Sequence, residues 1–232
     1  VEFGDTLGLT VTPSEFCLDG QRLLLTSGTH RQLNAQYHTE IDSMTLVVIT
    51  GETATNVVGA GQVTVLEFTA YGKDGSVRKF GGPGGVTVTR SLENFFPIKT
   101  IAWQQTSLTD VVGNTIAYTY STLDDTGERT LNSISYGGGS IIFNYVSSSR
   151  VDVAYSALGA SRRTKLMTSI EVRGPAPTNV LRYYTWDYSS ILPGVNAQGA
   201  RPRIAQIREC SSSPSSSPPP VCYAPTVFTW QD

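Results

Sequence analysis

Few side chains in this sequence have the types and spacing that metal binding requires. The only histidines, His30 and His38, lie in the polar segment THRQLNAQYHTE. A zinc site would need at least a third ligand, for which Glu40 and Asp42 are nearby candidates. Two histidines in such a segment are more often plain surface residues, so we expect no bound metal.

Catalytic chemistry is also poorly represented. Asp124 and Asp125 are adjacent carboxylates, but neighbours on a strand point to opposite faces, whereas a glycosidase needs two carboxylates across one cleft. The sequence has no G-x-S-x-G nucleophile elbow. GGPGGVTVTR lacks the lysine and the following helix of a phosphate-binding loop, and is predicted to be a flexible surface loop. We therefore predict no enzymatic activity and no cofactor.

Two of the three cysteines enclose a low-complexity segment. Cys210 and Cys222 flank SSSPSSSPPPV, a Ser/Pro-rich loop over residues 210–222. A disulfide between them would contribute about 3 kcal/mol in the chain-entropy model. The alternative is a pair of reduced thiols in a reducing compartment. Cys17 is expected to stay reduced as a small buried apolar residue.

The segment YYTWDY is the strongest candidate for ligand contact. Strand alternation would place Tyr184, Trp186 and Tyr188 on one face, where aromatic rings could stack on a sugar. Packing between strands is the favoured interpretation, and glycan binding is the alternative. The basic residues could form a patch but are expected to be a solvated face; they are Arg162, Arg163, Lys165, Arg201 and Arg203.

Composition excludes several classes of partner. Only 16% of the 232 residues are charged and the net charge is −2, so no strong field attracts nucleic acid. The longest apolar run, LVVIT, is far too short to span a membrane, and we expect no membrane insertion. The chain opens on VEFGDTLGLTVTP rather than on a secretory signal, which suggests a piece of a larger or processed protein.

The elements that must position these residues are strands. Helical periodicity is nearly absent, and alternating segments are separated by Gly, Pro, Ser or Asn. Turns are predicted at Asp19-Gly20, at Lys73-Asp74-Gly75 and at Gly113-Asn114. We predict an all-β fold of at least ten strands, built from consecutive antiparallel hairpins with little or no helix. DVVGNTIAYTY and TLNSISYGGGSIIFNY fit either an ordinary β-meander or one part of a long repetitive sheet.

The order of several phrases resembles a known family. The phrases are FCLDGQRLLL, EFTAYGKDGSVRKFGG, WQQTSLTDVVGNTIAYTYS, LNSISYGGGSIIFNYVSSSRVDVAY, RTKLMTSIEVR, VLRYYTWDY, RIAQIREC and CYAPTVFTWQD. Together they are similar to the N-terminal, virulence-plasmid B-like domain of Rhs/YD-repeat toxins, as in the B component of insecticidal Tc toxins. No single phrase is specific, but their collinearity is, and it covers nearly the whole chain.

The resemblance implies a structural function. In that family, a large β-sheet forms a hollow shell around a toxic polypeptide. Residues 1–232 would then be a single all-β unit of a secreted or extracellular Rhs/YD-repeat protein, with other parts of the shell or other copies of the chain as partners. Neighbouring strands would be packed by Tyr118, Tyr120, Tyr136 and Tyr145. The alternative is a secreted module that binds carbohydrate or another surface.

Two strand-like segments, GSIIFNYV and QVTVLEFTA, lack the Lys, Arg and Pro that protect sheet edges. We therefore expect edge-to-edge self-association of the isolated chain, weakened by Ile142→Lys or Val65→Lys if those strands are the edges.

Overall fold

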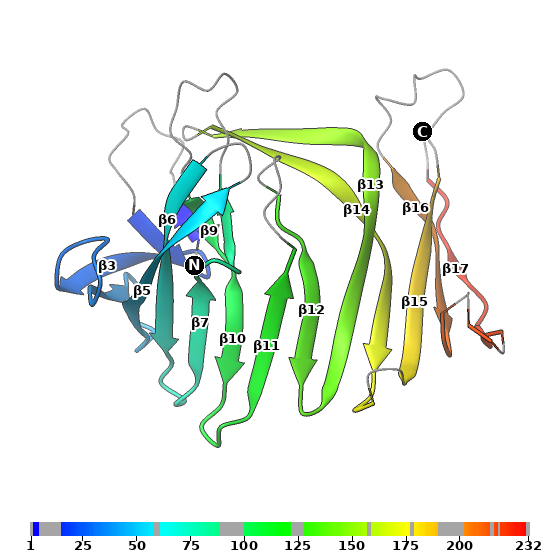
Figure 1. Ribbon diagram of the computed structural model, residues 1–232, viewed down its shortest axis with the longest axis horizontal. Helices are drawn as coiled ribbons and strands as arrows, with labels where there is room; N and C mark the ends of the chain where they lie inside the picture. Colours follow the sequence, from blue (N-terminus) through cyan, green and yellow to red (C-terminus); the bar gives the residue numbers. More distant parts are fainter. Residues whose placement is uncertain are drawn as a thin grey trace. The chain divides into compact units, whose positions relative to one another are not determined.

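The computed structural model contains strands, turns and loops, and none of the residues it describes is helical (Figure 1). It describes residues 2–4, 15–57, 61–88, 100–121, 128–156, 159–176, 179–189, 202–213, 216–217 and 219–230. The predicted fold class is confirmed: the chain is all-β and built from consecutive antiparallel hairpins. The strands are β1 (Glu2–Gly4), β2 (Glu15–Leu18), β3 (Gln21–Ser27), β4 (Gln36–Thr39), β5 (Leu46–Val57), β6 (Gly61–Tyr71), β7 (Val77–Gly81), β8 (Val86–Val88), β9 (Thr100–Trp103), β10 (Gln105–Thr109), β11 (Thr115–Tyr120), β12 (Leu131–Tyr136), β13 (Gly139–Ser156), β14 (Gly159–Arg173), β15 (Val180–Ser189), β16 (Arg203–Cys210) and β17 (Thr226–Val227).

Contacts divide the chain into two compact units. Unit 1 comprises residues 1–131 and 153–162, and unit 2 comprises residues 132–152 and 163–232. That residues 1–232 act as a single all-β unit stays a prediction.

Local turn chemistry accounts for the hairpins. Between β2 and β3, Asp19 and Gly20 have φ angles of 52° and 78°, the positive values that a two-residue type I′ turn requires. Between β12 and β13, Gly137 and Gly138 have φ angles of 45° and 86°. The turn between β6 and β7 has Gly75 at φ 78°. The turns predicted at residues 19–20 and 73–75 are therefore present.

Unit 1 is a curled sheet around an aromatic core. Its strands pair in the order β8–β9–β1–β2–β3–β4–β5–β6–β7–β10–β11, all antiparallel. Trp103 of β9 and Phe68 of β6 are far apart in this order, yet their ring centroids are 5.3 Å apart. Phe16 of β2 makes edge contacts with both rings. The sheet must therefore curl so that its strands share one core.

Unit 2 is a sheet in the order β12–β13–β14–β15–β16–β17. Most of its described side chains are half-buried. Among the described residues of this unit, Cys210 is the one buried hydrophobic side chain. Cross-strand packing within the sheet, rather than a second layer of buried side chains, is therefore what shields its apolar groups.

The predicted sheet edges are wrong. QVTVLEFTA belongs to β6, which pairs with β5 on one side and with β7 on the other, and Val65 is 1% exposed. GSIIFNYV belongs to β13, which lies between β12 and β14. The segments lack edge-protecting residues because they are interior strands, whose N–H and C=O groups are used by neighbours on both sides.

The glycine-rich segment also differs from expectation. It is a loop with an exposed tip at Pro83 and Gly84 and is followed by a short strand, as predicted, but Gly81, Gly82 and Gly85 are buried. The Gly81 amide donates to the Gln104 carbonyl at 2.9 Å, and the Gly85 carbonyl accepts from the Gln104 amide at 2.7 Å. The glycines thus allow backbones to approach where side chains would not fit.

Candidate functional site

The aromatic row of β15 directs its polar atoms into its own sheet. Tyr184, Trp186 and Tyr188 are all half-buried. The Tyr188 hydroxyl donates to the Met167 carbonyl of β14 at 2.7 Å and accepts from the Trp186 indole N–H at 2.9 Å. The same indole N–H also points at the Met167 carbonyl. These contacts hold Trp186 and Tyr188 across the β14–β15 pair, which favours packing over sugar stacking; glycan binding stays an untested alternative.

A polar ladder lies among neighbouring strands of unit 2. Asn144 of β13 donates through its amide to the Ser169 hydroxyl at 3.0 Å and to the Glu171 carboxylate at 3.1 Å. Arg173 donates through Nε to the same carboxylate at 2.9 Å. Ser169 is only 3% exposed, so this ladder satisfies a buried hydroxyl. Its geometry indicates a structural cross-link between β13 and β14.

The structure joins Cys210 to Cys222 in a disulfide with an S–S distance of 2.05 Å. Cys210 ends β16, and Cys222 lies beside it as an isolated β-bridge. Backbone hydrogen bonds flank the bridge on both sides, from the Ser211 amide to the Val221 carbonyl and from the Tyr223 amide to the Glu209 carbonyl, each at 2.9 Å. The Ser/Pro-rich loop is therefore anchored at its base by the disulfide and the ladder together.

The two histidines have different surroundings. His30 packs against Phe16 with ring centroids 5.1 Å apart, and its Nδ1 lies 3.2 Å from the Tyr37 hydroxyl. Burial raises the pKa of Tyr37, although the backbone hydrogen bond from Arg31 opposes this shift. His38 is exposed on β4. No group of three metal-ligating side chains occurs among the described residues.

Other candidate residues lie in several places. Arg162 and Arg163 are exposed, and the Arg203 guanidinium lies 5.8 Å from the centre of the Trp230 ring. Arg201, Asp124 and Asp125 lie outside the described residues. In the part of the chain that the structure describes, no helix is long and apolar enough to cross a membrane.

The predicted tyrosine packing is partly observed. The Tyr120 hydroxyl donates to the Gln105 carbonyl of β10 at 2.7 Å, and burial raises the pKa of Tyr120 to about 12. Tyr118 and Tyr145 are half-buried. Tyr136 is 42% exposed, because its cross-strand partner is Gly139, which has no side chain to cover the ring.

Arg129 is a structural residue that the sequence did not reveal. Its guanidinium donates to the carbonyls of Gly84, Ser121 and Pro83 at 3.0, 2.9 and 3.1 Å. Burial lowers the pKa of Arg129. One side chain thus ties the glycine-rich loop to the end of β11, a contact over more than forty positions that no local pattern signals.

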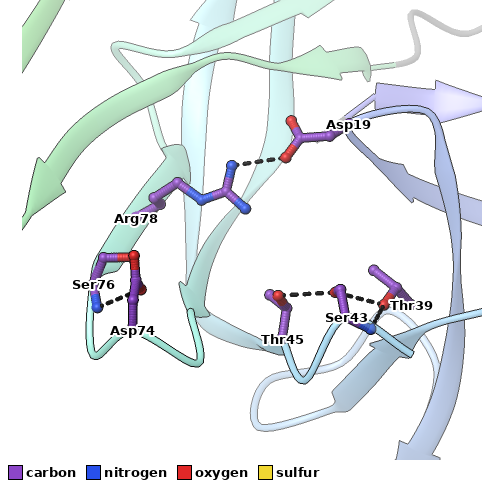
Figure 2. A network of polar contacts seen from close by, with 7 residues as sticks. All are labelled: Asp19, Thr39, Ser43, Thr45, Asp74, Ser76 and Arg78. Carbon is purple, nitrogen blue, oxygen red and sulfur yellow. Dashed lines mark hydrogen bonds and ion pairs between the residues drawn. The ribbon is translucent and has the colours of Figure 1, made fainter. Parts of the chain in front are cut away.

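Separate groups of polar contacts hold the hairpin ends of unit 1 (Figure 2). Arg78 of β7 donates to the Asp19 carboxylate at 2.8 Å. In the turn between β4 and β5, the Ser43 hydroxyl lies 2.8 Å from the Thr39 hydroxyl and donates to the Thr45 hydroxyl at 3.0 Å. Thr39 and Thr45 are 6% and 8% exposed, so the hydroxyl chain fixes this turn from its buried side.

Solved structures of Tc toxins contain a fold similar to that of this chain. The chain aligns with a chain of the TcdB2-TccC3-Cdc42 crystal structure at a TM-score of 0.65 and 13% identity, covering 92% of this chain and 13% of that one. It aligns with the Photorhabdus luminescens Tc holotoxin pore structure at a TM-score of 0.65 and 14% identity, covering 92% and 12%. The chain has a Tc/Rhs-like fold.

A third structure is of more similar length. The N-terminal domain of the effector protein SpvB from Salmonella typhimurium strain LT2 aligns at a TM-score of 0.61 and 11% identity, covering 87% of this chain and 82% of that domain. The chain therefore spans about an eighth of the Tc chains but most of the SpvB domain. No protein-family model matches the sequence, and no curated relative matches it.

Proposed function

We propose that this chain is a non-enzymatic, structural part of a toxin-encapsulating β-sheet shell of the Tc/Rhs type. The observation that carries the proposal is the fold likeness, which covers 92% of the chain in two Tc toxin structures. Its collinear phrases and its match to the SpvB domain support assignment to the N-terminal, virulence-plasmid B-like domain of a secreted virulence protein. Its partners would be other parts of the same toxin.

The physical mechanism is enclosure. Consecutive antiparallel hairpins make a wide sheet whose backbone groups are mutually satisfied, so it can separate two compartments without exposing peptide groups. The described polar side chains support this function, since Trp186, Tyr188, Asn144 and Glu171 bond within the sheet. No chemical step is required of the chain.

Limited proteolysis of the complete protein encoded by the gene tests the proposal. We expect a region outside residues 1–232 to resist protease in the native protein and to become cleavable when this wall is weakened by Phe68→Ala. Phe68 is fully buried, whereas Leu24 is 39% exposed, so Leu24→Ala is the matched control and should leave protection intact. A complete protein without any protected region, or glycan binding lost on Trp186→Ala, would contradict the shell.

A further inference from the structure

Four hairpin turns of unit 1 lie at one end of its sheet. They are residues 19–20, 40–45, 72–76 and 110–114, which we call the tip surface. Register places them side by side, because Leu46 pairs with Tyr71 and Val77 pairs with Thr109. Strands are about 4.8 Å apart, so successive turns of neighbouring hairpins are about 10 Å apart. Figure 1 shows the turns after β6 and after β10 at the same end, and a Cβ on Gly75 would lie 3.1 Å from Val111.

The tip surface carries the most exposed apolar side chains of unit 1. Ile41, Met44, Val111 and Val112 are 73%, 69%, 70% and 78% exposed. Among the other described large hydrophobic residues of this unit, none exceeds the 50% exposure of Leu33. They lie in two turns, 40–45 and 110–114, on either side of the polar turn 72–76. Exposed apolar side chains interspersed with polar ones on one surface are typical of protein interaction sites.

The turns hold these side chains in fixed positions. The Asp110 carboxylate accepts hydrogen bonds from the Val112 and Asn114 amides at 2.9 and 2.8 Å and from the Asn114 side chain at 2.7 Å. Met44 has φ 54°, an unusual value for a residue other than glycine, and its amide donates to Asp42 at 2.7 Å. A surface ordered before binding loses less conformational entropy when a partner docks.

The charge of the tip surface indicates which kind of partner it can bind. The turns of the tip surface contain five exposed acidic residues, Asp19, Glu40, Asp42, Asp74 and Asp110, against one basic residue, Lys73. Arg78 of β7 pairs with Asp19, so the surplus of acidic side chains comes from the other three turns. Hydrogen bonds from Ser76 and from Asn114 lower the pKa of Asp74 and Asp110, respectively, which keeps both charged in neutral solution. An acidic surface repels anionic membranes and nucleic acid and attracts lysine and arginine.

We propose that the tip surface is a docking site for a protein partner whose apolar side chains alternate with lysine or arginine side chains. This site goes beyond the proposed enclosure, because it uses turns at the end of the sheet rather than its faces. The exposed apolar side chains of turns 40–45 and 110–114 would supply the apolar contacts of the interface, and the carboxylates would steer the partner's basic side chains into place.

Fluorescence anisotropy with two labelled peptides tests the proposal. One peptide alternates leucine and lysine, and the matched peptide alternates leucine and glutamate. We expect the lysine peptide to bind the chain and the glutamate peptide to bind at least about tenfold more weakly, because like charges oppose docking. Ile41→Ser combined with Met44→Ser and Val112→Ser should weaken binding of the lysine peptide by about tenfold or more.

Matched control variants distinguish binding at the tip surface from nonspecific hydrophobic binding. Leu33→Ser, which is in unit 1 but outside the tip surface, and Val227→Ser, in unit 2, should leave binding unchanged. Glu40→Gln should weaken binding only at low salt. Equal binding of both peptides, or an unaffected triple variant with normal circular dichroism, overturns the proposal. The proposal is also overturned if the unmodified chain binds phosphatidylglycerol vesicles, or self-associates with rising concentration in sedimentation, and the triple variant abolishes that binding or self-association.

Discussion

At the scale of single residues, Gly20 and Gly81 share a left-handed backbone conformation but have different surroundings. Their φ angles are 78° and 82°. A Cβ at Gly20 would meet nothing within 4 Å, whereas one at Gly81 would lie 2.4 Å from the Leu66 carbonyl oxygen and 2.6 Å from the Trp103 ring. Conformational strain therefore acts at both positions, but steric overlap acts only at Gly81.

The substitution Gly20→Ala should lower the free energy of unfolding by about 1 kcal/mol, the strain of an L-residue in this region. Gly81→Ala should lower it by about 2–5 kcal/mol, since the overlap with backbone adds to the same strain. Urea denaturation followed by tryptophan fluorescence measures both values. Equal losses would show that the close packing of the glycine-rich loop is not present in solution.

Asp110 provides a pH-dependent test of the β10–β11 turn. Hydrogen bonds from Asn114 and from the Val112 amide lower the pKa of this carboxyl in the folded state. A depressed pKa means that the stabilisation is fully present above the unfolded pKa, about 3.9, and is lost as pH falls through the lower folded pKa. Asp110→Ala should therefore be destabilising at pH 7 and should converge with the unmodified protein in acid.

Thermal unfolding from pH 7 to pH 2 measures this convergence. Glu52→Ala is the control, because Glu52 is an exposed acid on β5 rather than in a turn. A destabilisation by Asp110→Ala that stays constant over the whole range would show that the carboxylate's charge has no part in holding the turn.

At the scale of elements, the Ser/Pro-rich loop depends on one covalent bond. Peptide mapping without reduction should recover residues around Cys210 and Cys222 as a cross-linked pair, while Cys17 is alkylated as a thiol. Removing the bridge with Cys210→Ser and Cys222→Ser together should cost about 3 kcal/mol in the chain-entropy model, because the loop is short. Recovery of Cys17 linked to either cysteine would reject the assignment.

At this scale, the features that can be predicted from the sequence are those that residues adjacent in the chain determine. Asp19-Gly20 could be recognised as a turn because two adjacent residues with positive φ specify it. The alternation of Tyr184, Trp186 and Tyr188 follows from strand geometry alone. The pairing of β7 with β10 could not be predicted, since it joins segments that are separated by β8 and β9 and depends on the curled sheet.

The interior strands show a second limit of prediction from local sequence. Missing lysines in β6 suggested an exposed edge, but Val65 is buried and both neighbours are paired. The sequence also does not indicate the hydrogen bonds from Trp186 and Tyr188 to Met167 or those from Arg129, because these bonds join residues from different strands and loops. Composition indicates that a segment forms a strand, whereas the pairing of strands in the folded chain decides whether that strand lies at an edge of the sheet.

At the scale of the whole chain, the two units differ in how their apolar side chains are buried. The hydrophobic cluster that contains Phe16, Phe68 and Trp103 lies wholly in unit 1. In unit 2, Cys210 is the one described hydrophobic side chain in the buried class. Because local opening is governed by buried apolar contacts, the units should differ in stability.

Native-state hydrogen exchange should resolve this difference strand by strand. We expect the slowest amides in β5 and β6, where Val47, Ile49 and Phe68 are fully buried and both strands have neighbours on each side. Amides of β16 and β17 should exchange faster, because β17 contributes only Thr226 and Val227 to its pairing and Val227 is 67% exposed. Reduction of the disulfide should speed exchange near Cys210 while leaving β5 and β6 unchanged. Uniform protection over both units would instead mean that they unfold as one cooperative structure, with the core of unit 1 stabilising strands that carry few buried side chains of their own.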